Sequence, residues 1–174
     1  MYKKIICGLI CLSLLTNAPF SYAGRTADSF DIRRFLATNK IASVEDYANW
    51  LPRHMRYIAD TGGDRWAAPE ETIKNGGGDC EDLAFLSAAV LKAFGIDARV
   101  VAHGDFKNGH VYCIFKYNGL YYTFENNHFA NTKQRSLKEM ALYLGKTQHS
   151  QYLAELNLEK KDVRFLYFIR YPKA

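Results

Sequence analysis

The chain has 174 residues, of which 48% are hydrophobic, 14% aromatic and 24% charged. The length suits one domain of ordinary size, and the composition suits a packed core, which excludes a disordered chain. The formal net charge of +5 falls to +3 if an N-terminal segment holding Lys3 and Lys4 is removed, and this is too small to indicate a nucleic-acid partner.

The first 23 residues have the pattern of a secretory signal peptide. A basic start precedes an apolar run over residues 5–15, and small residues stand at Ser21 and Ala23. The run is shorter than the roughly 20 residues that a membrane-spanning helix needs, so an uncleaved anchor is the weaker alternative. We therefore expect cleavage before Gly24. This leaves one domain over residues 24–174, periplasmic or secreted and without stable membrane insertion.

The spacing of apolar residues predicts helices first and strands afterwards. Helices are expected over 31–37, over 43–58 with an interruption at Pro52, over 69–74, and from Cys80 to a stop at Gly95. Aromatic and β-branched runs predict strands at 98–103, 110–117, 120–125 and 163–171, with a further helix over 136–144. This order indicates an α+β fold with an antiparallel sheet.

A cysteine stands where the longest helix is expected to begin, in the run Gly-Gly-Gly-Asp-Cys-Glu-Asp over residues 76–82. Asp79 suits the N-cap, which places Cys80 at the first helical position and Asp82 at the third. The positive end of the helix dipole and its unpaired N–H groups favour a thiolate over a thiol. The same N–H groups suit an oxyanion, so the position fits a nucleophile of acyl transfer, although a buried structural cysteine is the alternative.

A base and an orienting acid are expected on one face of a hairpin. Residues 117–120, Tyr-Asn-Gly-Leu, form a strong two-residue turn, and pairing Tyr117 with Leu120 fixes the register. Because side chains alternate across a sheet, the face then holds His110, Tyr112, Thr123, Glu125 and Asn127. Glu125 is a diagonal neighbour of His110, so with Cys80 the pair supplies nucleophile, base and acid.

Other arrangements of these groups stay open from the residues alone. His103 ends the preceding strand and is the main rival to His110 as the base. Cys113 is expected on the face away from His110 as a small buried hydrophobe, but in an oxidising compartment a disulfide to Cys80 is the alternative. A zinc site from these cysteines and a histidine lacks any familiar ligand spacing.

The stretch WAAPEETIKNGGGDCEDLAFLSAAVLKAFGIDARVV, residues 66–101, resembles the core of the transglutaminase-like superfamily, whose fold is related to papain. The runs GDCED and DRWAAPEE are most similar to bacterial transglutaminase-like cysteine proteinases, which include the LapG-type periplasmic proteases that release cell-surface adhesins. By position, the resemblance implies Cys80 as nucleophile and His110 as base. Glu125 falls where the family usually has aspartate.

This resemblance implies an exported thiol hydrolase that cleaves an amide bond in a protein substrate, such as a cell-surface adhesin. In LapG-type enzymes the acids beside the cysteine also bind calcium, which maps onto Asp79, Glu81 and Asp82. The carboxylates have another explanation, because the helix dipole favours acids in a first turn. Two other functions are open: transglutaminase or glutamine deamidase chemistry through the same acyl-enzyme, and a catalytically silent binding module.

Overall fold

Helices form the first half of the chain and strands dominate the second, as predicted. The computed structural model describes residues 30–105 and 107–169, and the expected signal peptide over 1–23 lies outside them. The helices are α1 (Ile32–Thr38), α2 (Val44–His54), α3 (Pro69–Asn75), α4 (Cys80–Ala93) and α5 (Leu137–Gln148). The main strands are β3 (Ala98–Gly104), β4 (Gly109–Tyr117), β5 (Leu120–Glu125), β6 (His128–Gln134), β7 (Tyr152–Asn157) and β8 (Asp162–Phe168).

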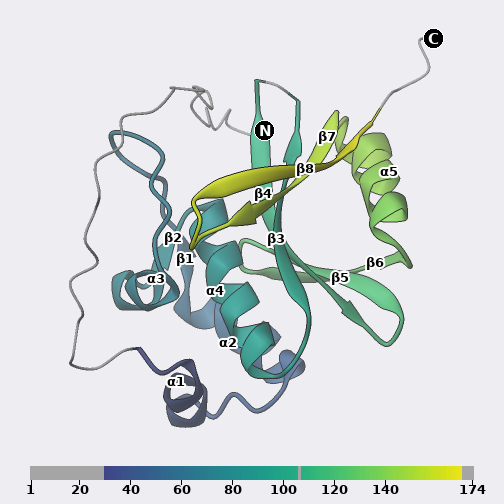
Figure 1. Cartoon of the computed structure of the whole chain (residues 1–174). Helices are drawn as coiled ribbons and strands as arrows, with labels where there is room; N and C mark the ends of the chain where they lie inside the picture. The colour runs from purple at the N-terminus through teal and green to yellow at the C-terminus, as the bar shows by residue number, and fades with distance from the viewer. Residues whose placement is uncertain (1–29, 106, 170–174) are drawn as a thin grey trace.

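These strands form one six-stranded antiparallel sheet in the order β6-β5-β4-β3-β7-β8 (Figure 1). The α+β class with helices on an antiparallel sheet is therefore confirmed. Within the described part of the chain, none of the helices has the length and apolar character that a membrane crossing requires.

The sheet separates two hydrophobic clusters, one on each face. On one face α4 packs across β3 and β4, and its Leu83 and Leu86 meet Cys113 and Phe115 of the sheet. On the other face α5 contributes Met140 to a smaller cluster. In Figure 1, α5 accordingly lies across the sheet from α1, α2 and α4. Alternate residues of β4 point to these two faces, so the two sides of the sheet have different neighbours.

The second helix differs from its prediction at both Pro52 and its end. Pro52 lies inside α2 without breaking it, and the helix ends at His54, less than one turn later. The chain then extends into the short strand β1 (Arg56–Tyr57), which pairs in parallel with β2 (Gly77–Gly78). The predicted continuation of the helix to residue 58 was therefore wrong, and β1 instead ties this segment to the start of α4.

Two strands of the six-stranded sheet were missed by the sequence pattern, in addition to the short strands β1 and β2. β6 has the sequence HFANTKQ and lies at an edge of the sheet, where most of its side chains are exposed. β7 has the sequence YLAELN and is covered on both sides, so its apolar residues do not alternate strictly. A half-buried strand is recognised by the alternation of apolar and polar residues. The polar edge strand β6 and the strand β7, which is buried on both sides, both lack this alternation. The last strand ends at Phe168, earlier than the predicted residue 171, which is among the residues not described.

Candidate active site

Cys80 occupies the first position of α4, as predicted. Asp79 is the N-cap residue, with extended backbone angles of −85° and −161°. The Cys80 side chain is buried, with 5% of its surface exposed. β2 leads directly into this turn, and a Cβ atom at Gly78 would overlap the Asp82 side chain. The glycine before Asp79 is therefore required by the close approach of the helix's own first turn.

The thiol contacts the next residue in the chain. Cys80 Sγ donates a hydrogen bond to Glu81 Oε2 at 3.0 Å. Glu81 is almost fully buried, and this burial raises the pKa of its carboxyl to about 9, with a hydrogen bond to Asp64 adding to the increase. A buried acid is thus part of the immediate surroundings of the thiol.

Among the described residues, neither Cys80 nor Cys113 is part of a disulfide. Cys113 is fully buried in the cluster under α4, and burial raises the pKa of its thiol above the usual value. Its predicted role as a small buried hydrophobic residue is confirmed. The alternative, a disulfide with Cys80, is not present. Cys113 therefore has none of the features that make a cysteine reactive.

His110 and Glu125 form the pair that the hairpin register predicted. β4 and β5 pair from Tyr117 opposite Leu120 through Cys113 opposite Phe124. Beyond the last of these pairs, His110 Nε2 lies 3.2 Å from Glu125 Oε1.

The direction of this hydrogen bond follows from the two groups. The bond from His110 lowers the pKa of Glu125 and outweighs the opposing effect of its partial burial. The ionised carboxylate can only accept, so Nε2 carries the proton and donates it. In the neutral ring Nδ1 is then the nitrogen with a free lone pair, and a general base needs such a lone pair.

His103, the rival base, lies on β3 directly opposite His110. It is 2% exposed, and its Nδ1 lies 2.7 Å from Ser150 Oγ. Burial, with a smaller effect of the nearby His110, lowers the pKa of His103 to about 3. A ring that resists protonation near neutral pH is poorly suited to take a proton from a thiol, so the geometry favours His110 as the base.

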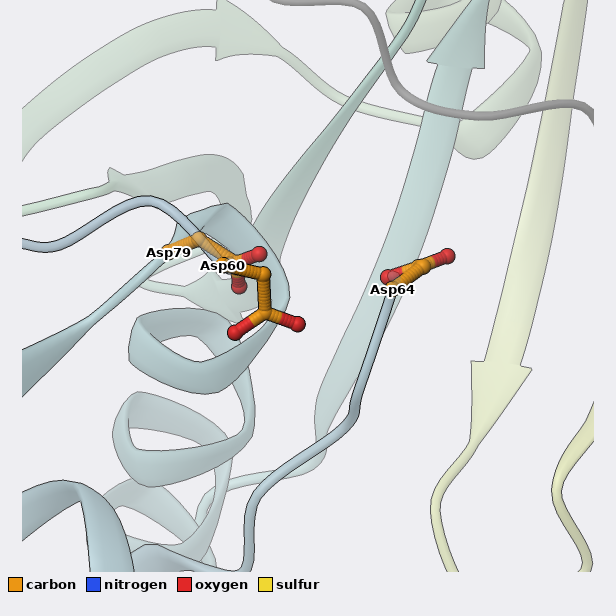
Figure 2. Close-up of side chains that lie close together, drawn as sticks. All are labelled: Asp60, Asp64 and Asp79. Carbon is orange, nitrogen blue, oxygen red and sulfur yellow. The ribbon is translucent and has the colours of Figure 1, made fainter. Parts of the chain in front are cut away.

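Three aspartates gather at the start of α4. Asp60 and Asp64 come from the loop between β1 and α3, and Asp79 is the helix N-cap; one ligand oxygen from each lies within 4.8 Å of the others. Figure 2 shows Asp60 and Asp79 close to the first turn of the helix, with Asp64 on the passing loop. Residues 58–65 of that loop line an open hollow, so Asp60 and Asp64 can be reached from solvent.

The predicted metal ligands Asp79, Glu81 and Asp82 are placed differently from one another. Only Asp79 belongs to the aspartate cluster. Glu81 accepts from the Cys80 thiol, and Asp82 accepts from the backbone N–H of Ala67 at 2.7 Å. Asp82 thus fastens the loop to the helix.

One observation indicates that the three aspartates could bind a hard cation. Asp79 is 8% exposed and makes no capping hydrogen bond with its side chain, and its Oδ1 is buried without a hydrogen-bond partner in the described chain. Burial, followed by the nearby charge of Asp82, raises the pKa of Asp79 to about 6. A buried carboxylate oxygen without a donor is costly, and calcium prefers oxygen ligands of this kind.

A model of the Transglutaminase-like superfamily matches residues 31–130. The chain belongs to this superfamily. The matched range includes every residue of the site described above, from Asp60 to Glu125.

The solved structures similar to this transglutaminase-like chain include LapG of Legionella pneumophila. The calcium-bound form is 17% identical, with a TM-score of 0.51, over 77% of this chain and 75% of that one. The EGTA-treated form is 22% identical, with a TM-score of 0.42, over 52% of this chain and 55% of that one. The likeness to the calcium-bound form supports the fold. None of the curated proteins compared with the sequence matched it.

The sequence pattern missed Asp60 and Asp64 as members of this transglutaminase-like site. Both lie in the run Asp-Thr-Gly-Gly-Asp, residues 60–64, which reads as an ordinary polar turn. Their meeting with Asp79 depends on β1 pairing with β2, a contact between segments about twenty residues apart. The signal in the sequence that could have identified them is the presence of two acidic residues on either side of a pair of glycines.

Proposed function

We propose that this protein is an exported cysteine peptidase that cleaves an amide bond in a protein substrate. The observation that carries the proposal is the His110 and Glu125 pair, held on β4 and β5 at 3.2 Å. The strand with His110 packs against α4, the helix that begins at Cys80. A silent binding module has no need of a histidine whose tautomer is fixed by a carboxylate.

The proposed reaction has two halves, and in each half His110 acts first as a base and then as an acid. His110 Nδ1 takes the proton of the Cys80 thiol, and Sγ attacks the amide carbonyl. The backbone N–H of Cys80 helps to hold the oxyanion, and His110 returns the proton to the departing amine, leaving a thioester. Water then attacks the thioester with His110 again as base, which releases the acid and restores the thiol. Glu125 holds the ring throughout and stabilises its protonated form.

We further propose that calcium binds beside the thiol. Asp60, Asp64 and Asp79 would hold the ion, and Glu81 and Asp82 complete the acidic surroundings. When bound, the ion supplies positive charge that offsets the carboxylates next to Cys80. The support is the donor-less oxygen of Asp79 and the meeting of loop and helix carboxylates.

The proposed location is the periplasm or the exterior, because the first 23 residues have the pattern of a signal peptide. The class of substrate suggested by the LapG-type sequence motif, a cell-surface adhesin, belongs to the same proposal.

The test is to incubate the exported protein, in calcium, with a mixture of unfolded proteins and identify the products by mass spectrometry. We expect new peptide amino termini with wild type and with the Cys113→Ala control, and none with Cys80→Ala. If glutamine residues are instead converted to glutamate or joined to added amines, the chemistry is acyl transfer without cleavage. If neither change occurs, the peptidase proposal fails.

A further inference from the structure

His110 stands between two neighbours that come from the strands on either side of it. β4 lies between β3 and β5 in the sheet. Glu125 on β5 accepts from Nε2, and His103 on β3 is the direct cross-strand partner of His110. The rings of the two histidines are 5.9 Å apart at 80°, an edge-to-face contact. The ring of His110 thus has a carboxylate on one side, and it contacts both the imidazole of His103 and the ring of Tyr112, whose centroid is 4.9 Å away.

His103 is itself held in place by contacts with Ser150 and Tyr112. Its Nδ1 lies 2.7 Å from Ser150 Oγ, and Ser150 is buried in the link between α5 and β7. The ring also lies against Tyr112, 4.5 Å between centroids, and Tyr112 donates to Gln148 Oε1 at the end of α5. The position of His103 is therefore set by the face of the sheet that carries α5, and not by α4.

The charge state of His103 suits a place beside a proton-accepting histidine. Its Nε2 is buried and has no hydrogen-bond partner among the residues that the structure describes. Burial lowers the pKa of His103 to about 3 and outweighs the opposing effect of the Glu125 carboxylate. The neighbour of His110 is therefore a neutral ring, which does not repel the imidazolium that forms when His110 takes a proton.

We infer that His103 is a positioning residue for His110. Ser150 holds the His103 ring in place, and this ring packs against the imidazole of His110 and keeps it aligned with Glu125. This inference rests on the proposed function, since it assigns His103 a part in the same reaction. It acts through His110 and touches no reacting atom.

The experiment uses two readouts that a purely structural role would leave alone. The first is the rate at which iodoacetamide alkylates Cys80 at neutral pH. The second is the nitrogen and proton NMR signal of the His110 Nε2–H group, which reports its bond to Glu125 and needs no substrate. The variants are His103→Asn, which keeps an amide for Ser150 but removes the ring, His103→Phe, which keeps a ring, and Ser150→Ala, which removes the anchor.

We expect His103→Asn to slow alkylation roughly 10- to 100-fold, because small losses of alignment cost that much, and to broaden the His110 signal. Ser150→Ala should slow it several-fold, on the order of 3 to 10. His103→Phe should restore most of the rate. A matched control is His54→Asn, since His54, at the end of α2, also stacks on an aromatic ring, Trp50, at 4.6 Å.

The inference is overturned if folded His103→Asn alkylates at the wild-type rate with an unchanged His110 signal, or if His103→Phe is as slow as His103→Asn. Should His103→Asn not fold, Ser150→Ala decides: a wild-type rate and signal overturn the inference, and a loss of both supports it. If wild type cleaves no protein, the proposed function fails, but the NMR comparison still judges the positioning role.

Discussion

His110 Nε2 and Glu125 Oε1 lie 3.2 Å apart and join neighbouring strands of the sheet. The contact fixes which nitrogen of the ring carries the proton, so it also fixes which nitrogen can accept one. The carboxylate is that of a glutamate, one methylene longer than the aspartate usual at this place in the family to which the sequence motif points.

Replacing Glu125 should test its orienting role. In Glu125→Gln the amide can present its nitrogen to His110, which reverses the bond and favours the wrong tautomer. We expect Cys80 alkylation and peptide cleavage to fall roughly 10²-fold or more. The measurement is both rates against Glu159→Gln, an exposed glutamate in the turn before β8. Equal rates in the two variants would show that Glu125 does not orient the base.

The same carboxylate should make stability depend on pH. The hydrogen bond from His110 lowers the pKa of Glu125 in the folded state. A lowered folded-state pKa means that the contribution to stability is present above the unfolded value, about 4.3, and is lost as pH falls through the folded pKa. The contribution is small, because 43% of the side chain is exposed. The urea midpoints of wild type and Glu125→Gln should therefore converge from about pH 7 to about pH 3.

Calcium should stabilise the fold through the aspartate cluster. Removing the ion with EGTA should lower the melting temperature by roughly 5 °C or more, and added calcium should restore it. Asp60→Asn combined with Asp79→Asn should make the protein indifferent to both additions, while Asp97→Asn, at an 85% exposed side chain, should behave as wild type. Calorimetry that finds no calcium binding to the chelator-stripped wild type at millimolar concentration would remove this part of the proposal.

Gly78 should be sensitive to a single added methyl group. A Cβ there overlaps the Asp82 side chain, so Gly78→Ala must shift the first turn of α4. We expect a loss of about 1 to 3 kcal/mol in the free energy of unfolding, together with slower alkylation of Cys80. The comparison is Gly95→Ala, where the added atom meets open space but the backbone φ of +77° is unfavourable. It should lose stability and keep the alkylation rate; slow alkylation in both would point to a general effect.

Local chemistry explains which parts of the site the sequence predicted. The Asn118-Gly119 turn sets the register by itself, and the register brings His110 to Glu125. The glycine run and Asp79 likewise place Cys80 at a helix start without help from distant residues. Each of these relationships depends on a short stretch of sequence, so the sequence pattern alone can predict it.

The other parts depend on contacts between distant segments. Asp60 and Asp64 reach Asp79 only because β1 pairs with β2. His103 was a plausible base until α5 and β7, of which β7 was not predicted, covered it and left it neutral. Whether a histidine is a base or a neutral support depends on burial, and burial by a missed strand could not be predicted.

The most direct test of the central claim is the labelling of Cys80 and Cys113. Exported protein, saturated with calcium at neutral pH, is treated with iodoacetamide, and the label is located by peptide mass mapping. The account predicts that Cys80 reacts first, that buried Cys113 reacts only after unfolding, and that His110→Ala slows Cys80 roughly 100-fold or more. Equal labelling of the two cysteines, or a Cys80 rate unchanged by His110→Ala, would contradict a thiol nucleophile served by His110.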